Sequence, residues 1–324
     1  MRGYDVHTAK LVDIPLVRRL AEKGIMLDSE LCYTRDAGGN ILFSSILLPQ
    51  RGLYTLVGRA GKQQVMGQFR LKSDDHLAQI IYVAPPLEPE MLDTAWLAIM
   101  DAMAYEAGRR GAHILTAEVD EGSPLFVTMR QTGFAVYARQ EIWRRGVTDE
   151  PLPESQLTGD LAEETDDDQM DIQLLYSNIV PRLVQPITLP SRDSKGLVYR
   201  KGNRVQAYIA MSEGKNGVYL MPYMHPDVLG REATAIIAGV IAQSARAERV
   251  PVYVCVRRYQ DWLTESLSYM GFEAWTQQAV MVRHIAAGVR QTNFAPLVHK
   301  TLEAVPHASP INNSNLTNQE KPST

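Results

Sequence analysis

The most constraining feature of the sequence is an internal repeat with a period of 138 residues. Gly133-Phe134 closes one stretch and Gly271-Phe272 closes another, and 271 − 133 = 138. The same offset superposes further positions: Ala104 on Ala242, Ala107 on Ala245, Leu125 on Leu263, Gln140 on Gln278 and Arg145 on Arg283. A repeat of this length indicates one domain written twice, so any candidate site can be compared in two copies.

Length and composition agree with two globular domains. The 324 residues fit about two domains of roughly 100–200 residues each, and 45% of them are hydrophobic, enough for a core in each half. The net charge of −4 gives no electrostatic reason to expect nucleic acid or an anionic membrane as a partner. Cys32 and Cys255 have no metal-ligand spacing and form no disulfide framework. We expect a cytoplasmic protein without a membrane span, signal peptide or metal site.

Composition also divides the chain into segments. We expect an N-terminal domain over residues 1–147, an acidic, Pro-containing linker over 148–169, a C-terminal domain over 170–290 and a disordered polar tail over 291–324. The two domains would pair within the chain.

Hydrophobic periodicity predicts the same order of elements in both repeats. Each has a helix near its start, which in the first repeat follows a short run from Tyr4 to Ala9. Strands that end in a central apolar strand come next, and then a long helix, a strand, a short helix and a closing strand. In the first repeat the helix follows Asp13, and the later elements are expected at 40–43, 53–57, 65–69, 78–83, 96–107, 113–119, 124–132 and 134–143. In the second repeat they are expected at 170–180, 196–199, 205–210, 217–221, 233–245, 250–256, 262–269 and 272–282.

This order resembles the GNAT acyltransferase family over nearly the whole chain apart from the linker and tail. The local matches are Tyr82-Val83-Ala84-Pro85 before the long helix, Val65-Met66-Gly67 in the preceding hairpin, and the two Gly-Phe junctions. The resemblance implies an α+β fold with two tandem units, each a mixed, mostly antiparallel sheet flanked by helices.

The resemblance also implies an acyl-CoA site, with acetyl-CoA as the acyl donor. In that family the central strand and the strand after the long helix splay apart, and the pantetheine arm lies in the gap. The pyrophosphate binds at the N-terminus of the long helix, where unpaired N–H groups and the helix dipole attract an anion. The family pattern there is Arg or Gln, two residues, Gly, one residue, then Gly or Ala.

The first repeat departs from this pattern. Glu88, Met91 and Asp93 occupy the three pattern positions, and Glu90 adds a further carboxylate. Like charges beside a pyrophosphate repel it, whereas acids in the first turn of a helix stabilise the helix dipole. We therefore expect the first repeat not to bind acyl-CoA in the family's usual way.

The second repeat has fewer acidic residues at this position and would repel a phosphate less. Its pattern positions hold Pro226, Leu229 and Arg231, but Gly230 could admit a close approach and Arg231 could pair with a phosphate. The alternative is that Gly230 is a loop residue and Arg231 a surface charge. The candidate cofactor-binding residues are, in chain order, Met221, Tyr223, Leu229, Gly230 and Arg231.

No catalytic residue can be assigned. Many family members have a tyrosine acid four residues before the junction glycine, where this chain has Met129 and Leu267. The family's asparagine before that helix is replaced by Gly122 and Gln260. Glu118, Tyr223 and His225 lie near strand ends and could supply a general base, or they could be structural.

Two functions follow as hypotheses. The first is an acyl-CoA-dependent N-acyltransferase, an N-acetyltransferase in the simplest case, that uses its C-terminal domain on a small-molecule or peptide amine. The alternative is a catalytically degenerate member of the same fold that binds a ligand or a protein partner. Fold alone does not separate them, because function depends on the site.

Overall fold

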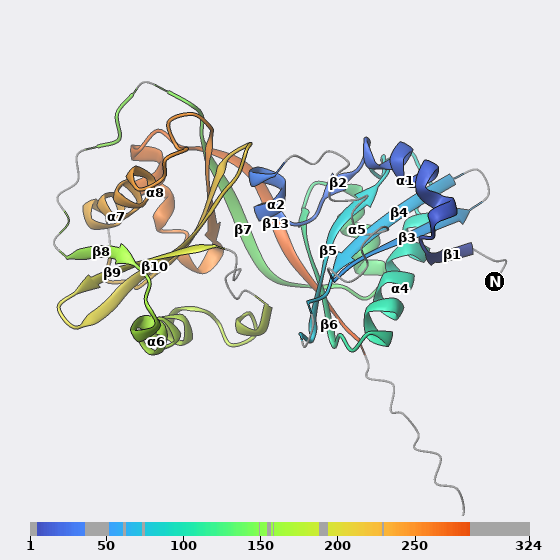
Figure 1. Cartoon of the computed structure of the whole chain (residues 1–324), viewed down its shortest axis with the longest axis horizontal. Helices are drawn as coiled ribbons and strands as arrows, with labels where there is room; N and C mark the ends of the chain where they lie inside the picture. The colour runs from blue at the N-terminus through green and yellow to red at the C-terminus, as the bar shows by residue number, and fades with distance from the viewer. Residues whose placement is uncertain are drawn as a thin grey trace, which may run out of the picture. The chain divides into compact units, whose positions relative to one another are not determined.

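The computed structural model describes residues 5–35, 52–60, 63–72, 75–148, 150–153, 157, 159–187, 194–228 and 230–285 (Figure 1). These residues belong to one compact unit. The strand expected at 40–43 and the tail expected at 291–324 lie outside the described residues.

The first repeat follows the expected order and adds a short strand and a short helix after its first helix. Its elements are β1 (Asp5–Thr8), the 3-10 helix η1 (Leu11–Asp13), α1 (Ile14–Ala21), β2 (Ile25–Met26), α2 (Ser29–Thr34), β3 (Leu53–Ala60), β4 (Gln63–Arg70), β5 (Leu77–Ala84), α4 (Thr94–Arg109), β6 (Ile114–Asp120), α5 (Pro124–Gln131) and β7 (Ala135–Arg145).

The second repeat has the elements that its sequence predicts, together with a short edge strand and three 3-10 helices among the described residues. They are β8 (Asp160–Glu163), η3 (Asp166–Asp168), α6 (Gln169–Ile179), η4 (Gln185–Ile187), β9 (Lys195–Lys201), β10 (Arg204–Glu213), β11 (Val218–Met224), α7 (Arg231–Ala242), β12 (Val252–Arg257), η5 (Arg258–Gln260), α8 (Leu263–Tyr269) and β13 (Glu273–His284).

The two repeats exchange their closing strands. All described strands form one 13-stranded sheet with the order β1-β3-β4-β5-β6-β13-β7-β12-β11-β10-β9-β8, and β2 pairs with β5 off this path. The strand β13 therefore lies between β6 and β7, while β7 pairs with β12 of the second repeat. The long strands β7 and β13 cross between the halves in Figure 1. The sequence repeat thus does not divide the described residues into two separate compact domains.

Equivalent residues of the repeat meet where the closing strands pair. Gln140 lies opposite Gln278 in the antiparallel ladder, and Gln140 Nε2 donates a hydrogen bond to Gln278 Oε1 at 2.8 Å. The offset of 278 − 140 = 138 is the period of the repeat, so a local twofold axis passes between these two residues.

The repeated Gly-Phe pairs end α5 and α8 in the same way. Gly133 and Gly271 have φ angles of 84° and 77°, a left-handed conformation that glycine adopts without steric cost. The next amide bonds back into the helix, from Phe134 N–H to the Met129 carbonyl and from Phe272 N–H to the Leu267 carbonyl. This helix ending turns each phenylalanine into the core, which explains why the pair recurs.

Helices cover both faces of the sheet in each half. Along α4 the apolar stripe that includes Trp96, Ile99 and Met103 is buried against the N-terminal part of the sheet, as its helical spacing predicts. On the opposite face lie α1 and α2. In the second repeat α7 and α8 pack on one face and α6 on the other.

The segment expected to be a solvated linker contains structure. Strand β8 pairs with β9 at the edge of the sheet, and Leu157 and Leu161 pack against the core beneath α7. The structure differs from the expectation because two apolar side chains within an acidic segment suffice to hold it on the sheet edge.

Helix α2 joins the two halves. The Tyr33 ring stacks on Tyr253 with ring centroids 4.3 Å apart, and Ser212 Oγ donates to Glu30 Oε1 at 2.8 Å. At its start, the Asp28 carboxylate accepts from Leu31 N–H at 3.0 Å and lies 3.2 Å from Arg70 Nη2. Burial raises the pKa of Asp28 to about 6, although Arg70 opposes this shift.

The Asp28 pKa predicts a pH dependence of stability. A carboxyl whose pKa is raised in the folded state favours folding at low pH, and this contribution is lost as pH rises from about 4 to about 6. Asparagine caps a helix equally well but does not titrate. Between pH 7.5 and 5, we expect wild type to gain about 1 kcal/mol relative to Asp28→Asn. Urea unfolding at both pH values measures the difference, and parallel profiles would contradict the assignment.

Candidate functional site

Both halves have the strand separation on which an acyl-CoA site would depend. The parallel strands β5 and β6 pair only from Leu77↔Ile114 to Gln79↔Thr116, and β11 and β12 only from Val218↔Val252 to Leu220↔Val254. Beyond these pairs each central strand continues without its parallel neighbour. The two resulting gaps differ in what fills them.

In the N-terminal half the chain itself fills the gap. Ile25 and Met26 pair with Val83 and Tyr82 of β5. Leu27 then bridges both strands, because its N–H donates to the Ile81 carbonyl and its carbonyl accepts from Glu118 N–H, each at 2.9 Å. The Leu27 side chain is 2% exposed. A backbone segment therefore holds the strand-edge groups that a pantetheine arm would use.

In the C-terminal half one side chain spans the gap. The Gln260 carboxamide accepts from Met224 N–H at 2.8 Å and donates to the Pro222 carbonyl at 2.9 Å. Pro222 itself has no N–H to offer. Gln260 is 1% exposed and occupies the position where the family has asparagine. Its amide thus supplies one donor and one acceptor to the edge of β11, as a bound amide ligand would.

The helix starts beside the two gaps also differ. At α4 the carboxylates of Glu88 and Glu90 are exposed and that of Asp93 is half-buried, so three acids surround the start of the helix. At α7 the Glu232 carboxylate is bonded to Lys201 Nζ at 2.9 Å and to Tyr199 Oη at 2.7 Å, which leaves the exposed Arg231 as a further cation. The second helix start is therefore the less repulsive one for an anion.

The candidate cofactor-binding residues lie along β11 and at the start of α7. Gly230 has a φ of 52° and open space around its Cα, and Arg231 begins α7. Met221 is half-buried and Tyr223 is buried in β11. Leu229 lies outside the described residues.

The candidate base residues lie in different surroundings. Tyr223 Oη donates to Met221 Sδ at 3.0 Å, and burial raises the pKa of Tyr223 well above its ordinary value. His225 lines a cavity of about 240 Å³ between α6 and the ends of β10 and β11, with its Nδ1 3.3 Å from the Asp227 carboxylate. Glu118 accepts from Ser29 N–H at 2.9 Å and lies 3.7 Å from Arg257 Nη2. The cavity that His225 lines includes neither Glu118 nor Tyr223 among its lining residues.

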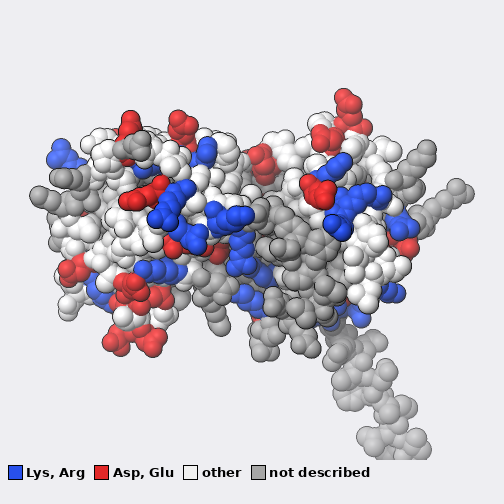
Figure 2. All heavy atoms as spheres, turned by 45° about the horizontal axis from the view of Figure 1, so that its top comes forward, with Lys and Arg blue, Asp and Glu red and all other residues white. Residues whose placement is uncertain are grey.

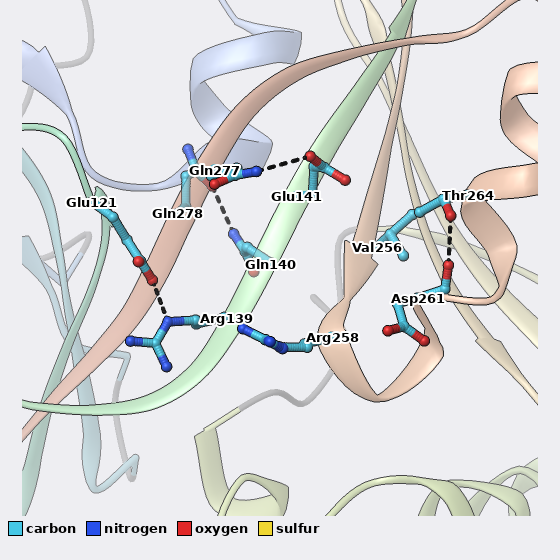
Figure 3. A pocket seen from close by; sticks show the side chains of 10 residues that line it. All are labelled: Glu121, Arg139, Gln140, Glu141, Val256, Arg258, Asp261, Thr264, Gln277 and Gln278. Carbon is cyan, nitrogen blue, oxygen red and sulfur yellow. Dashed lines mark hydrogen bonds and ion pairs between the residues drawn. The ribbon is translucent and has the colours of Figure 1, made fainter.

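A second cavity lies where the two halves meet (Figure 3). Its volume is about 350 Å³. Arg139 Nε donates to Glu121 Oε1 at 2.7 Å on one side, and Gln277 Nε2 donates to Glu141 Oε1 at 3.3 Å on the other. The lining residues are Glu121, Arg139, Gln140, Glu141, Val256, Arg258, Asp261, Thr264, Gln277 and Gln278.

The positions of the family's tyrosine acid are apolar and inaccessible. Met129 and Leu267 are both 0% exposed and belong to the cores of their halves. Neither side chain can donate a proton to a departing thiolate.

Sequence reasoning missed Arg257. It is a charged residue in the last position of an apolar strand, and it is 3% exposed. The available signal was the arginine itself within the run Val252 to Arg257, because an arginine is almost never fully buried unless it has a partner.

The described surface has charges of both signs. Figure 2 shows acidic and basic side chains interspersed over the face that it presents. In the described ranges no helix is long and apolar enough to cross a membrane. Nor do those ranges contain a group of three or more His, Cys, Asp or Glu side chains that could hold a metal ion.

Solved structures share this architecture across most of the chain. A GCN5-related N-acetyltransferase from Sphaerobacter thermophilus aligns with a TM-score of 0.56 at 12% identity, covering 87% of this chain and 96% of the other. A tandem GNAT protein from the clavulanic acid biosynthesis pathway aligns at 0.52 and 13%, covering 87% and 99%. A putative acetyltransferase from Pyrococcus horikoshii aligns at 0.51 and 12%, covering 88% and 90%. No protein-family model and no curated protein matches the sequence.

The fold is thus that of the GNAT N-acetyltransferases. One of these structures is a tandem GNAT protein, and that single match covers 87% of this chain.

Proposed function

We propose that this protein is an acyl-CoA-dependent N-acyltransferase whose cofactor site lies in its C-terminal half. The observation that carries the proposal is the difference between the two gaps. A backbone segment hydrogen-bonded to both strands fills the first, whereas a single carboxamide, that of Gln260, spans the second. A side chain can change rotamer without unfolding its neighbours, so the second gap is the easier one to open.

Acyl-CoA would enter by replacing Gln260. An amide of the pantetheine arm could take over the bonds to Met224 N–H and the Pro222 carbonyl, which are the groups that Gln260 holds. The pyrophosphate would lie at the start of α7, close to Gly230 and the cationic Arg231. When bound, acyl-CoA supplies the activated thioester.

The protein's own contribution to the chemistry would be positioning. With Met129 and Leu267 in place of a tyrosine acid, the protein would hold an amine beside the thioester so that direct attack needs little covalent help. The acceptor would be a small-molecule or peptide amine.

Calorimetric titration with acetyl-CoA tests the proposal. We expect binding to wild type and about tenfold weaker binding to Arg231→Glu, because a phosphate would then face a carboxylate. Arg249→Glu is the matched control, since it makes the same charge change at an exposed site beyond the far end of α7. No binding by wild type at millimolar acetyl-CoA would overturn the proposal, and equal binding by Arg231→Glu would overturn the placement of the site.

A second candidate is a catalytically degenerate protein that binds a different ligand or a protein partner. It is favoured by the closure of both strand edges, one by Leu27 and the other by Gln260. In that case neither wild type nor Gln260→Ala would bind acetyl-CoA, although the substitution removes the side chain that spans the second gap.

A further inference from the structure

Arg257 is a buried cation whose charge is poorly compensated. Its guanidinium has one ion-pair partner among the described residues, Glu118, at 3.7 Å from Nη2. The Nε and Nη1 atoms are buried and have no hydrogen-bond partner there. A guanidinium stays protonated and presents five N–H donors in a fixed fork. A buried donor without a hydrogen bond lowers the stability of the folded protein, so we expect an acceptor to bind these N–H groups.

Tyrosine hydroxyl groups interact electrostatically with the same charge. Tyr219 Oη and Tyr259 Oη are also buried and without a hydrogen-bond partner among the described residues. Burial raises the pKa of Tyr219, Tyr223 and Tyr259, and the positive charge of Arg257 acts in the opposite direction on all three. Tyr259 therefore keeps its proton at neutral pH and can donate a hydrogen bond to an anion.

The cluster lies close to the protein surface. Tyr259 and Met221 are half-buried, and the Glu118 side chain is 12% exposed. Arg257 follows Cys255 on the face of β12 that looks away from α7 and α8, because Val252, Val254 and Val256 face those helices. A ligand would therefore approach Arg257 from the α6 side of the sheet.

We propose that Arg257, together with Tyr259, binds the carboxylate of a small-molecule ligand in the C-terminal half. A carboxylate can form paired parallel hydrogen bonds along one edge of the guanidinium, through Nη2 and either Nε or Nη1, and each edge includes one of the two unpaired nitrogens. The role of this ligand rests on the proposed function. If the protein transfers an acyl group to an amine, the carboxylate would belong to the acceptor, which would then resemble an amino acid. Glu118 competes with that carboxylate for the same guanidinium.

The test follows the Arg257 Nε–H resonance in ¹⁵N–¹H spectra while acetate is added to the full-length protein without acyl-CoA. We expect a saturable shift with acetate and none with equal concentrations of ethylammonium chloride. Glu118→Gln removes the competing carboxylate and should tighten acetate binding several-fold. Arg257→Met should weaken the thermal stabilisation by acetate about tenfold or more, while Arg258→Met, an exposed arginine next in sequence, should leave it unchanged.

Two results would overturn the inference. One is an Nε–H resonance that acetate does not shift in either wild type or Glu118→Gln, as expected if the cluster holds only an internal water. The other is equal stabilisation of wild type and Arg257→Met. If Arg257→Met does not fold, the comparison of wild type with Glu118→Gln still decides. Because acyl-CoA is absent from these measurements, their failure is separate from failure of the proposed function.

Discussion

A chain that ends at Phe272 should lose the fold of its N-terminal half, although it keeps every residue of the first repeat. The truncation removes β13, which pairs with β6 on one side and with β7 on the other. Its four residues from Ala279 to Val282 are at most 3% exposed. Losing the three larger buried side chains, Val280, Met281 and Val282, at roughly 1.5–3 kcal/mol each, together with two ladders, approaches the whole stability of about 5–15 kcal/mol.

Hydrogen exchange of the α4 amides measures whether the N-terminal half is still folded, because the truncation removes no residue of that half. We expect full loss of their protection. A chain that ends at Ala287 is the control, because it retains all the described strands and the whole compact unit. Protected α4 amides in the chain ending at Phe272 would show that the first repeat folds without the exchanged strand.

Leu27→Ala should destabilise the protein by about 2–5 kcal/mol, the range for truncating a buried leucine. Leu27 is 2% exposed, and its side chain belongs to the N-terminal hydrophobic core. The backbone bonds to Ile81 and Glu118 do not depend on the side chain, so the gap should stay closed. Leu11→Ala, at a position 67% exposed, should cost less than 0.5 kcal/mol.

Urea unfolding of the two variants measures the difference. Equal stability of Leu27→Ala and Leu11→Ala would mean that the segment from Ile25 to Leu27 does not contribute to the N-terminal core. Tight binding of acetyl-CoA gained by Leu27→Ala alone would mean that this segment can be displaced, and the assignment of the site to the C-terminal half would then fail.

The order of elements was predictable because each long element has its own hydrophobic period. The stripe on α4 and the apolar run of β5 predict a helix and a central strand from sequence alone. The strand exchange was not predictable. The closing strands β7 and β13 occupy equivalent positions of the repeat, so each could complete its own half or the other half. The alternation of side chains along a strand fits both arrangements equally well and does not choose between them.

The contents of the two gaps were less predictable still. Strand β2 has two residues and carries no periodic signal, yet with Leu27 it determines whether the first gap is open. The sequence shows Gln260 as a departure from the family pattern, but its two bonds to the edge of β11 depend on a side-chain conformation. Arg257 falls at the end of a strand, where an arginine in most proteins would reach solvent.

The pairing of Gln140 with Gln278 bears on how a two-unit chain of this kind can arise. Since equivalent residues meet on the local axis, the same closing strand could pair with its own copy in a symmetric dimer of single units. When the two units are joined in one chain, their association becomes intramolecular and no longer depends on protein concentration. Each unit is then free to change independently, and here one gap has been closed by backbone while the other is closed by a single side chain.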